Sequence, residues 1–135
     1  MCDLYCGLGG FSAGALRAGA TVVVGVDNDY VPLKLFGANL PGSQVALATL
    51  GPGGDSADLP PPATDLHVHL SPPCTDLSPA RNGSDACVER GTQMLRWSIE
   101  FVLTRGDYSW SIENVSTPHT RAVLEEYAAL HPDRV

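Results

Sequence analysis

The chain has 135 residues, of which 44% are hydrophobic, and its formal net charge is −7. This length suits one domain with a small hydrophobic core. The sequence contains eight Lys and Arg residues and fifteen Asp and Glu residues. This composition argues against a chain that binds nucleic acid by itself, because such binding needs clustered cations. No apolar run is long enough to span a bilayer, and the start shows no signal-peptide pattern. We therefore expect an intracellular protein without a membrane partner, cytoplasmic in a prokaryote and nuclear in a eukaryote.

Strand-like and helix-like segments alternate along the chain. The strands are predicted at residues 2–5, 21–26, 45–50, 65–70 and 108–112. The helices are predicted at residues 11–18, 30–40 and 85–104, and from Pro118 onward with Thr117 as the N-cap. Residues 51–63, rich in Gly, Pro and Asp, are predicted to form a loop. The alternation predicts one α/β domain with a mainly parallel sheet and helices on both of its faces.

Apolar residues recur at helical spacing in the two later helices and predict the sides that face the core. They are Leu95, Ile99, Val102 and Leu103 in the first helix, with Trp97 and Phe101 also assigned to the core, and Val123, Leu124, Tyr127 and Leu130 in the second. His67 and His69 lie in a predicted strand. Packing against a local partner is favoured for these two histidines, and a pH-linked or metal role is the alternative.

Chemically suggestive residues come at the ends of four predicted strands. They are the glycine-rich turn of residues 7–10, the carboxylate of Asp27, the thiol of Cys74 and the carboxylate of Glu113. Because the carboxyl ends of parallel strands share one edge of a sheet, we expect a ligand site at this edge. A thiol and a carboxylate placed in this way suit a nucleophile and an acid. The four cysteines are expected to be thiols, and their spacing matches no metal site.

Three motifs follow one another in the order typical of one enzyme family. They are Asp3-Leu4-Tyr5-Cys6-Gly7-Leu8-Gly9-Gly10-Phe11, Ser71-Pro72-Pro73-Cys74 and Glu113-Asn114-Val115. With these motifs the chain resembles the DNA (cytosine-5) methyltransferases. The resemblance implies a Rossmann-like fold that depends on S-adenosyl-L-methionine (SAM), and methyl transfer to carbon 5 of cytosine through a covalent cysteine adduct.

The resemblance also implies which residues bind the cofactor. The methionine carboxylate of SAM would lie near the glycine turn, where the helix N-terminus favours an anion. Asp27 would accept hydrogen bonds from the two ribose hydroxyls. The matching cofactor-binding positions are Tyr5, Gly7, Leu8, Gly9, Gly10, Asp27, Asn28 and Pro73.

The catalytic and substrate-binding positions follow from the same resemblance. Cys74 is the nucleophile that adds to carbon 6 of the cytosine ring. Glu113 is the acid that supports the charge developing at ring nitrogen 3. The substrate-binding positions are Ser78, Arg81 and Asn114. The substrate is double-stranded DNA from which the target cytosine is flipped, because the base cannot be reached inside the duplex.

The resemblance reaches only the first part of the family. It implies a partial catalytic domain over residues 1–135, without the last strands of the sheet and without the target-recognition domain. We therefore expect that methylation of DNA needs a complementing C-terminal methyltransferase half. Two alternatives stay open, a tRNA cytosine-5 methyltransferase and a non-catalytic SAM-binding module or inactive remnant. No metal is implied.

Overall fold

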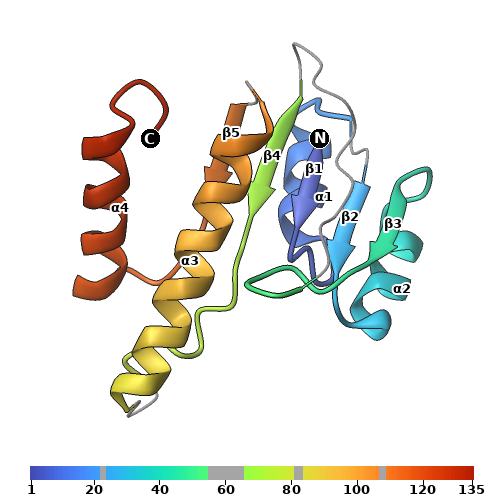
Figure 1. Cartoon of the computed structure of the whole chain (residues 1–135). Helices are drawn as coiled ribbons and strands as arrows, with labels where there is room; N and C mark the ends of the chain where they lie inside the picture. Colours follow the sequence, from blue (N-terminus) through green and yellow to red (C-terminus); the bar gives the residue numbers. More distant parts are fainter. Residues whose placement is uncertain (22–23, 55–65, 81–83, 107–108) are drawn as a thin grey trace.

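A computed structural model, which describes residues 1–21, 24–54, 66–80, 84–106 and 109–135, contains a five-stranded sheet and four helices. All strand pairs are parallel, and the strand order is β3-β2-β1-β4-β5 (Figure 1). The strands are β1 (Cys2–Leu4), β2 (Val24–Asp27), β3 (Gln44–Leu47), β4 (His67–Leu70) and β5 (Ser109–Ile112). The helices are α1 (Gly10–Arg17), α2 (Tyr30–Asn39), α3 (Asp85–Arg105) and α4 (Pro118–Leu130). The predicted α/β domain with a parallel sheet is confirmed.

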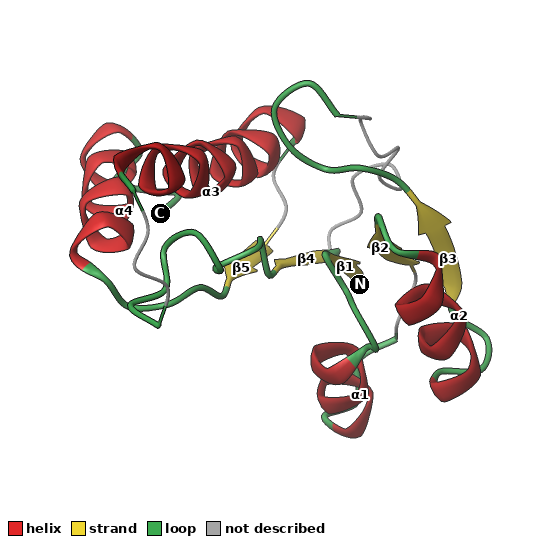
Figure 2. Ribbon diagram, turned by 90° about the horizontal axis from the view of Figure 1, so that it is seen from below, coloured by secondary structure: helices red, strands yellow, loops and turns green. Residues whose placement is uncertain are grey.

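Helices cover both faces of the sheet, as predicted. Figure 2 shows α1 and α2 on one side and α3 and α4 on the other. On the side of α3, the core joins buried side chains of the central strands to that helix: Cys2, Leu4, Val26, Val68, Leu70, Phe101 and Val102. The second helix of this layer, α4, packs on α3 through a cluster of Leu95, Ile99, Val123 and Tyr127. None of the helices in the described ranges is long and apolar enough to cross a bilayer.

On the other face, a glycine lets α2 pack closely on the sheet. A Cβ atom at Gly25 of β2 would lie only 2.5 Å from Cζ of Phe36, which is fully buried. Phe36 shares its cluster with Leu33 and Leu40 of the same segment and with Cys6 beyond β1. This packing fixes α2, and therefore also fixes the turn between β2 and α2 at the carboxyl edge of the sheet.

The helix ends follow ordinary capping chemistry. The side chain of Thr117 accepts a hydrogen bond from the backbone N–H of Thr120 at 3.3 Å, and Pro118 is the first residue of α4, so the predicted cap is confirmed. At α2, the side chain of Asp29 accepts from the N–H of Val31 at 2.8 Å.

Some strand bounds differ from the prediction. The first strand ends at Leu4 because the next residue, Tyr5, has a left-handed backbone with φ of 60°, which cannot continue a strand. The third strand ends at Leu47 and not at residue 50. Residues 22, 23, 65 and 108, assigned to strands from the sequence, lie outside the described residues.

One prediction about the core is wrong. Leu130 was expected on the inward side of α4, but its side chain is 65% exposed. The buried residues of this helix are Thr120, Val123 and Tyr127. Leu130 lies on the same side of the helix as Val123, but it is the last residue of α4 and lies outside the cluster that packs α4 on α3.

Candidate functional site

Loops that follow neighbouring strands lie side by side at the carboxyl edge of the sheet. Backbone hydrogen bonds beyond the strand ends join them, from Cys6 N to Val26 O (3.0 Å), from Ser71 N to Leu4 O (3.1 Å) and from Glu113 N to Leu70 O (2.9 Å). The edge therefore brings together the glycine turn, Asp27, the loop of Cys74 and the tip that carries Glu113.

The glycine turn has backbone conformations that other residues rarely adopt. Gly7 and Gly9 have φ of 51° and 85°, in the left-handed region that glycine enters without a Cβ penalty. A Cβ at Gly9 would also lie 2.8 Å from the Phe36 ring, whereas nothing lies within 4 Å of one at Gly7. Leu8 is 56% exposed, and Gly10 begins α1 at the surface. The turn is thus closed toward α2 and open beside Gly7.

Asp27 joins the second strand to this turn. One carboxylate oxygen accepts from the backbone N–H of Gly7 at 2.8 Å, and the other accepts from that of Asp29 at 3.0 Å. Each oxygen of a carboxylate has two lone pairs, so both can accept a further hydrogen bond. The side chain is half-buried, and Asn28 beside it is exposed. Asp27 can therefore receive hydroxyl groups of a ligand while it holds the turn.

Tyr5 lies at the tip of β1 and reaches α3. Its hydroxyl is 3.1 Å from Oγ of Ser98 and donates to the sulfur of Met94 at 3.5 Å. Burial raises the pKa of Tyr5 to about 12. The hydroxyl is thereby committed to α3, and the ring is the part of Tyr5 that remains for a ligand. Its left-handed backbone is the kind of local strain that gathers at functional sites.

A direct hydrogen bond joins the Cys74 loop to the Glu113 loop. The side-chain amide of Asn114 donates to the backbone oxygen of Pro72 at 3.1 Å, and its oxygen accepts from Val115 N at 2.9 Å. Cys74 is half-buried, and Glu113 is exposed. Asn114 thus holds together the two loops that carry the predicted nucleophile and acid.

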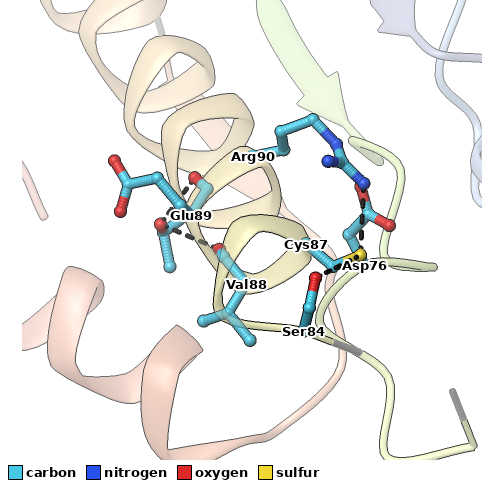
Figure 3. Close-up of polar contacts among 7 residues, drawn as sticks. Asp76, Ser84, Cys87, Val88, Glu89 and Arg90 are labelled. Atoms are coloured by element: carbon cyan, nitrogen blue, oxygen red, sulfur yellow. Dashed lines mark hydrogen bonds and ion pairs between the residues drawn. The ribbon is translucent and has the colours of Figure 1, made fainter. Parts of the chain in front are cut away.

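The first turns of α3 hold the Cys74 loop from the other side (Figure 3). The carboxylate of Asp76 pairs with Nε of Arg90 at 3.2 Å, and Nη2 of Arg90 donates to the sulfur of Cys87 at 3.2 Å. The hydroxyl of Ser84 also donates to this sulfur, at 3.6 Å. These hydrogen bonds lower the pKa of the Cys87 thiol. A Cβ at Gly91 would lie 2.6 Å from Cγ of Leu77, so only glycine allows this contact.

Two hollows flank Asp76. One, of about 370 Å³, is lined by Pro73, Thr75, Asp76, Arg90, Gly91 and Met94. The other, of about 240 Å³, is lined by Asp76, Leu77, Ser78, Pro79, Val88, Thr117, Pro118 and His119. The predicted cofactor residue Pro73 and the predicted substrate residue Ser78 therefore border different hollows. Arg81 lies outside the described residues.

Sequence reasoning missed the contribution of α3 to this edge. Arg90, Gly91 and Met94 were not predicted as site residues. The available signal was Gly91, because an isolated glycine inside a long helical pattern usually has a packing reason. Within the described ranges, no three His, Cys, Asp or Glu side chains lie close enough to hold a metal ion.

Three solved structures that match this fold are described as methyltransferases. A Pyrococcus horikoshii protein assigned as an RNA methyltransferase matches with a TM-score of 0.54 and 20% identity, over 96% of this chain and 56% of that one. An Escherichia coli prophage protein assigned as a DNA modification methyltransferase matches with a TM-score of 0.58 and 20% identity, over 96% and 36%. A TehB-like SAM-dependent methyltransferase from Corynebacterium glutamicum matches with a TM-score of 0.51 and 14% identity, over 93% and 62%.

These matches confirm the predicted methyltransferase fold. At such identities they establish the fold alone, and the chain spans only 36% to 62% of the length of the three proteins. No curated protein matches the sequence significantly. The sequence profile of the C-5 cytosine-specific DNA methylases matches residues 1–118, which include all the loops of the carboxyl edge. The chain belongs to the C-5 cytosine-specific DNA methylase family.

Proposed function

We propose that this chain is the cofactor-binding and nucleophile-bearing part of an enzyme that methylates carbon 5 of cytosine in DNA. One observation carries the proposal. The hydrogen bond from Asn114 to Pro72 unites the loops of Cys74 and Glu113 at the edge that also holds the glycine turn and Asp27.

The edge fits SAM, the cofactor that folds of this kind generally bind. The open side of the turn at Gly7, with the N-terminus of α1 beside it, suits the methionine carboxylate. The remaining lone pairs of Asp27 suit the ribose hydroxyls. The flanking cofactor positions are Tyr5, Leu8, Gly9, Gly10, Asn28 and Pro73. When bound, SAM supplies an electrophilic methyl group.

Carbon 5 of the free cytosine ring is too weak a nucleophile to take a methyl group directly, and Cys74 and Glu113 together activate it. The Cys74 thiolate adds to carbon 6, and Glu113 supports the charge that develops at ring nitrogen 3. Carbon 5 gains electron density and takes the methyl group. A base then removes the carbon 5 proton, and the carbon–sulfur bond breaks to release the thiolate. Asn114 shapes the loop that holds the flipped base. Ser78 is a further substrate-binding position, and Arg81 is assigned to a phosphate of the nucleic acid.

The DNA itself needs a second contributor. The chain carries a net charge of −7, and DNA binding depends on neutralising phosphates with Lys and Arg. We therefore assign most of the DNA-binding surface to a complementing C-terminal methyltransferase half, and we expect this chain alone to bind SAM without methylating DNA.

The test uses calorimetry with SAM and a duplex that contains 5-fluorocytosine, which leaves the cysteine adduct trapped. The chain alone should bind SAM. Joined to the C-terminal half of a longer family member, it should form an adduct that mass spectrometry assigns to Cys74. Cys74→Ser should abolish the adduct, whereas Cys87→Ser is the matched control and should retain it.

Each other outcome contradicts part of the proposal. An adduct that survives Cys74→Ser would exclude this residue as the nucleophile. SAM binding without any adduct in the joined protein would favour the non-catalytic module. Capture of a tRNA bearing 5-fluorocytosine in preference to the duplex would favour the tRNA branch.

A further inference from the structure

A continuous chain of side-chain hydrogen bonds runs along one face of β4 and β5. It consists of Ser109, His67, Ser111, His69 and Ser71, which we call the histidine–serine row. The distances are 3.0 Å from Ser109 Oγ to His67 Nδ1, 2.9 Å from His67 Nε2 to Ser111 Oγ, 2.8 Å from Ser111 Oγ to His69 Nδ1 and 2.9 Å from His69 Nε2 to Ser71 Oγ. Strand geometry explains the row, because residues two apart share a face, and His67 and His69 pair in register with the serines of β5.

The hydrogen positions along the row can be assigned from one end. The hydroxyl of Ser109 donates to the backbone oxygen of Leu66 at 3.4 Å, so Ser109 accepts from Nδ1–H of His67. Nε2 of His67 then accepts from Ser111, which accepts from Nδ1–H of His69. Nε2 of His69 finally accepts from the hydroxyl of Ser71. Two neutral imidazoles thus satisfy every ring nitrogen of the row.

The row lies on the face opposite α3. Val68 and Leu70, which alternate with the histidines, are fully buried in the core beneath α3, so the histidines point to the side where Figure 2 shows α1 and α2. There the Phe11 ring of α1 stacks on His69 with centroids 3.3 Å apart and planes 7° apart. His69 is 4% exposed.

In the described part of the chain, two charged groups close to the row can be named. On β1, Asp3 is in register with His69, and its carboxylate accepts a hydrogen bond from Ser12 of α1. The amino group of Met1 is the cation that acts on His67. Burial, with a smaller contribution from His67, lowers the pKa of His69 to about 4, and burial also lowers that of His67. Both rings are therefore neutral near pH 7.

We propose that the histidine–serine row fixes the alignment of β4 and β5, and that proton uptake by the row releases it. The row ends at the strand tips that carry the Cys74 and Glu113 loops, so His67 and His69 are positioning residues for these loops. This role in catalysis rests on the proposed function. Protonation turns Nε2 of either ring from an acceptor into a donor. At His67 this leaves the hydroxyl proton of Ser111 without its acceptor. At His69 it does the same to the hydroxyl proton of Ser71 and puts a charge in a buried place.

One backbone amide reports on the alignment without any methyl transfer. The N–H of Glu113 donates to Leu70 O at 2.9 Å, just beyond the two strands. The N–H of Ala48 donates to Asp27 O at 3.0 Å beyond β2 and β3 and serves as the internal reference. The experiment is hydrogen exchange by NMR on the whole chain from about pH 7 to about pH 4.5, corrected for intrinsic exchange.

We expect the protection of Glu113 to fall about tenfold over this range while that of Ala48 stays constant. Ser111→Ala should remove the protection of Glu113 already at neutral pH, and Ser43→Ala, in the turn before β3, is the matched control. His69→Gln removes the buried ring and leaves only His67 to take up a proton, so the fall in protection at Glu113 should be clearly smaller than in the parent chain. This variant also separates the row from Asp3, which titrates in the same range.

Several results would overturn the inference. Protection at Glu113 that ignores both pH and Ser111→Ala would show that the row does not set the alignment. The same pH dependence in His69→Gln would assign the effect to another group. If Ser111→Ala does not fold, ¹⁵N spectra of the native rings decide, because Nε2–H tautomers or titration of both rings near pH 6.5 would exclude the assigned row. None of these readouts involves the chemistry of Cys74, so the proposed function can fail or hold independently.

Discussion

Replacing Gly91 by alanine tests whether α3 positions the loop of the predicted nucleophile. A Cβ at this buried position would lie 2.6 Å from Cγ and 2.9 Å from Cδ2 of Leu77, and 3.3 Å from Cβ of Asp76. Leu77 is 5% exposed and cannot turn into solvent without leaving its place. Because carbon atoms in contact prefer separations of about 3.5–4.0 Å, the loop would have to retreat by roughly 1 Å.

The expected magnitude comes from two opposing effects. Overpacking of this kind costs about 1–3 kcal/mol, whereas replacing a glycine inside a helix by alanine gains about 0.5–1 kcal/mol. Gly14 of α1 is the matched control, since it is exposed and nothing lies within 4 Å of an added Cβ. Gly14→Ala should therefore stabilise the chain, and Gly91→Ala should be less stable than Gly14→Ala by about 1–3 kcal/mol.

Urea unfolding of both variants measures this difference, and the corresponding separation in Tm is roughly 4 °C per kcal/mol. Iodoacetamide labelling, read by peptide mass, follows the loop itself. We expect Cys74 to label faster in Gly91→Ala than in the parent chain, under conditions where both are folded. Equal stabilisation by the two substitutions, with unchanged labelling of Cys74, would refute the argument that α3 holds this loop.

Three further predictions concern the cofactor, a helix end and pH. Asp27→Asn should weaken SAM binding at least tenfold in calorimetry, because a charged acceptor contributes about 1.5–3 kcal/mol; unchanged affinity would remove Asp27 from the cofactor site. Thr117→Ala should cost about 1 kcal/mol in urea unfolding through the lost cap of α4, and an unshifted midpoint would contradict this. The pKa of His69 is lowered to about 4, so its contribution to stability is lost as pH falls from about 6.5 toward 4. The pKa of Asp3 is raised to about 6, so its contribution is lost as pH rises through about 6. With His69→Gln the first of these contributions is absent, and the free energy of unfolding should fall by about 2–3 kcal/mol from pH 4 to pH 7 relative to the parent chain. Parallel curves would exclude the assignment.

Much of the fold could be predicted because its signals are local. The alternation of strand and helix patterns, the Thr117 cap and the apolar side of α3 all depend on residues close in sequence. Strand ends were less predictable because the strands have only three or four residues. The left-handed backbone at Tyr5 ends β1 where side-chain type alone favours a longer strand.

The site divides in the same way. The glycine turn, Cys74 and Glu113 could be proposed from motifs, because each comes at or shortly after the end of a strand in the sequence. The contacts that support them could not, since they join distant segments. Arg90 reaches Asp76 across 14 residues, and His69 meets Ser111 across 42. Such pairs depend on the packing of α3 and on the register of β4 and β5, which no local pattern specifies.

The support within the chain is unequal between the two predicted catalytic groups. The loop of Cys74 is held by Asn114 on one side and by Arg90 and Gly91 on the other, and the thiol is half-buried. Glu113 is fixed through its backbone, but the residue is exposed. A hydrogen bond from a carboxyl group to a cytosine ring gains its full strength only where water is excluded. This chain therefore holds the loop of the predicted nucleophile on both sides. The predicted acid would need the flipped base and a complementing half to exclude water from it. Besides the negative charge, this difference gives a second physical reason to expect that the chain alone binds SAM but does not methylate DNA.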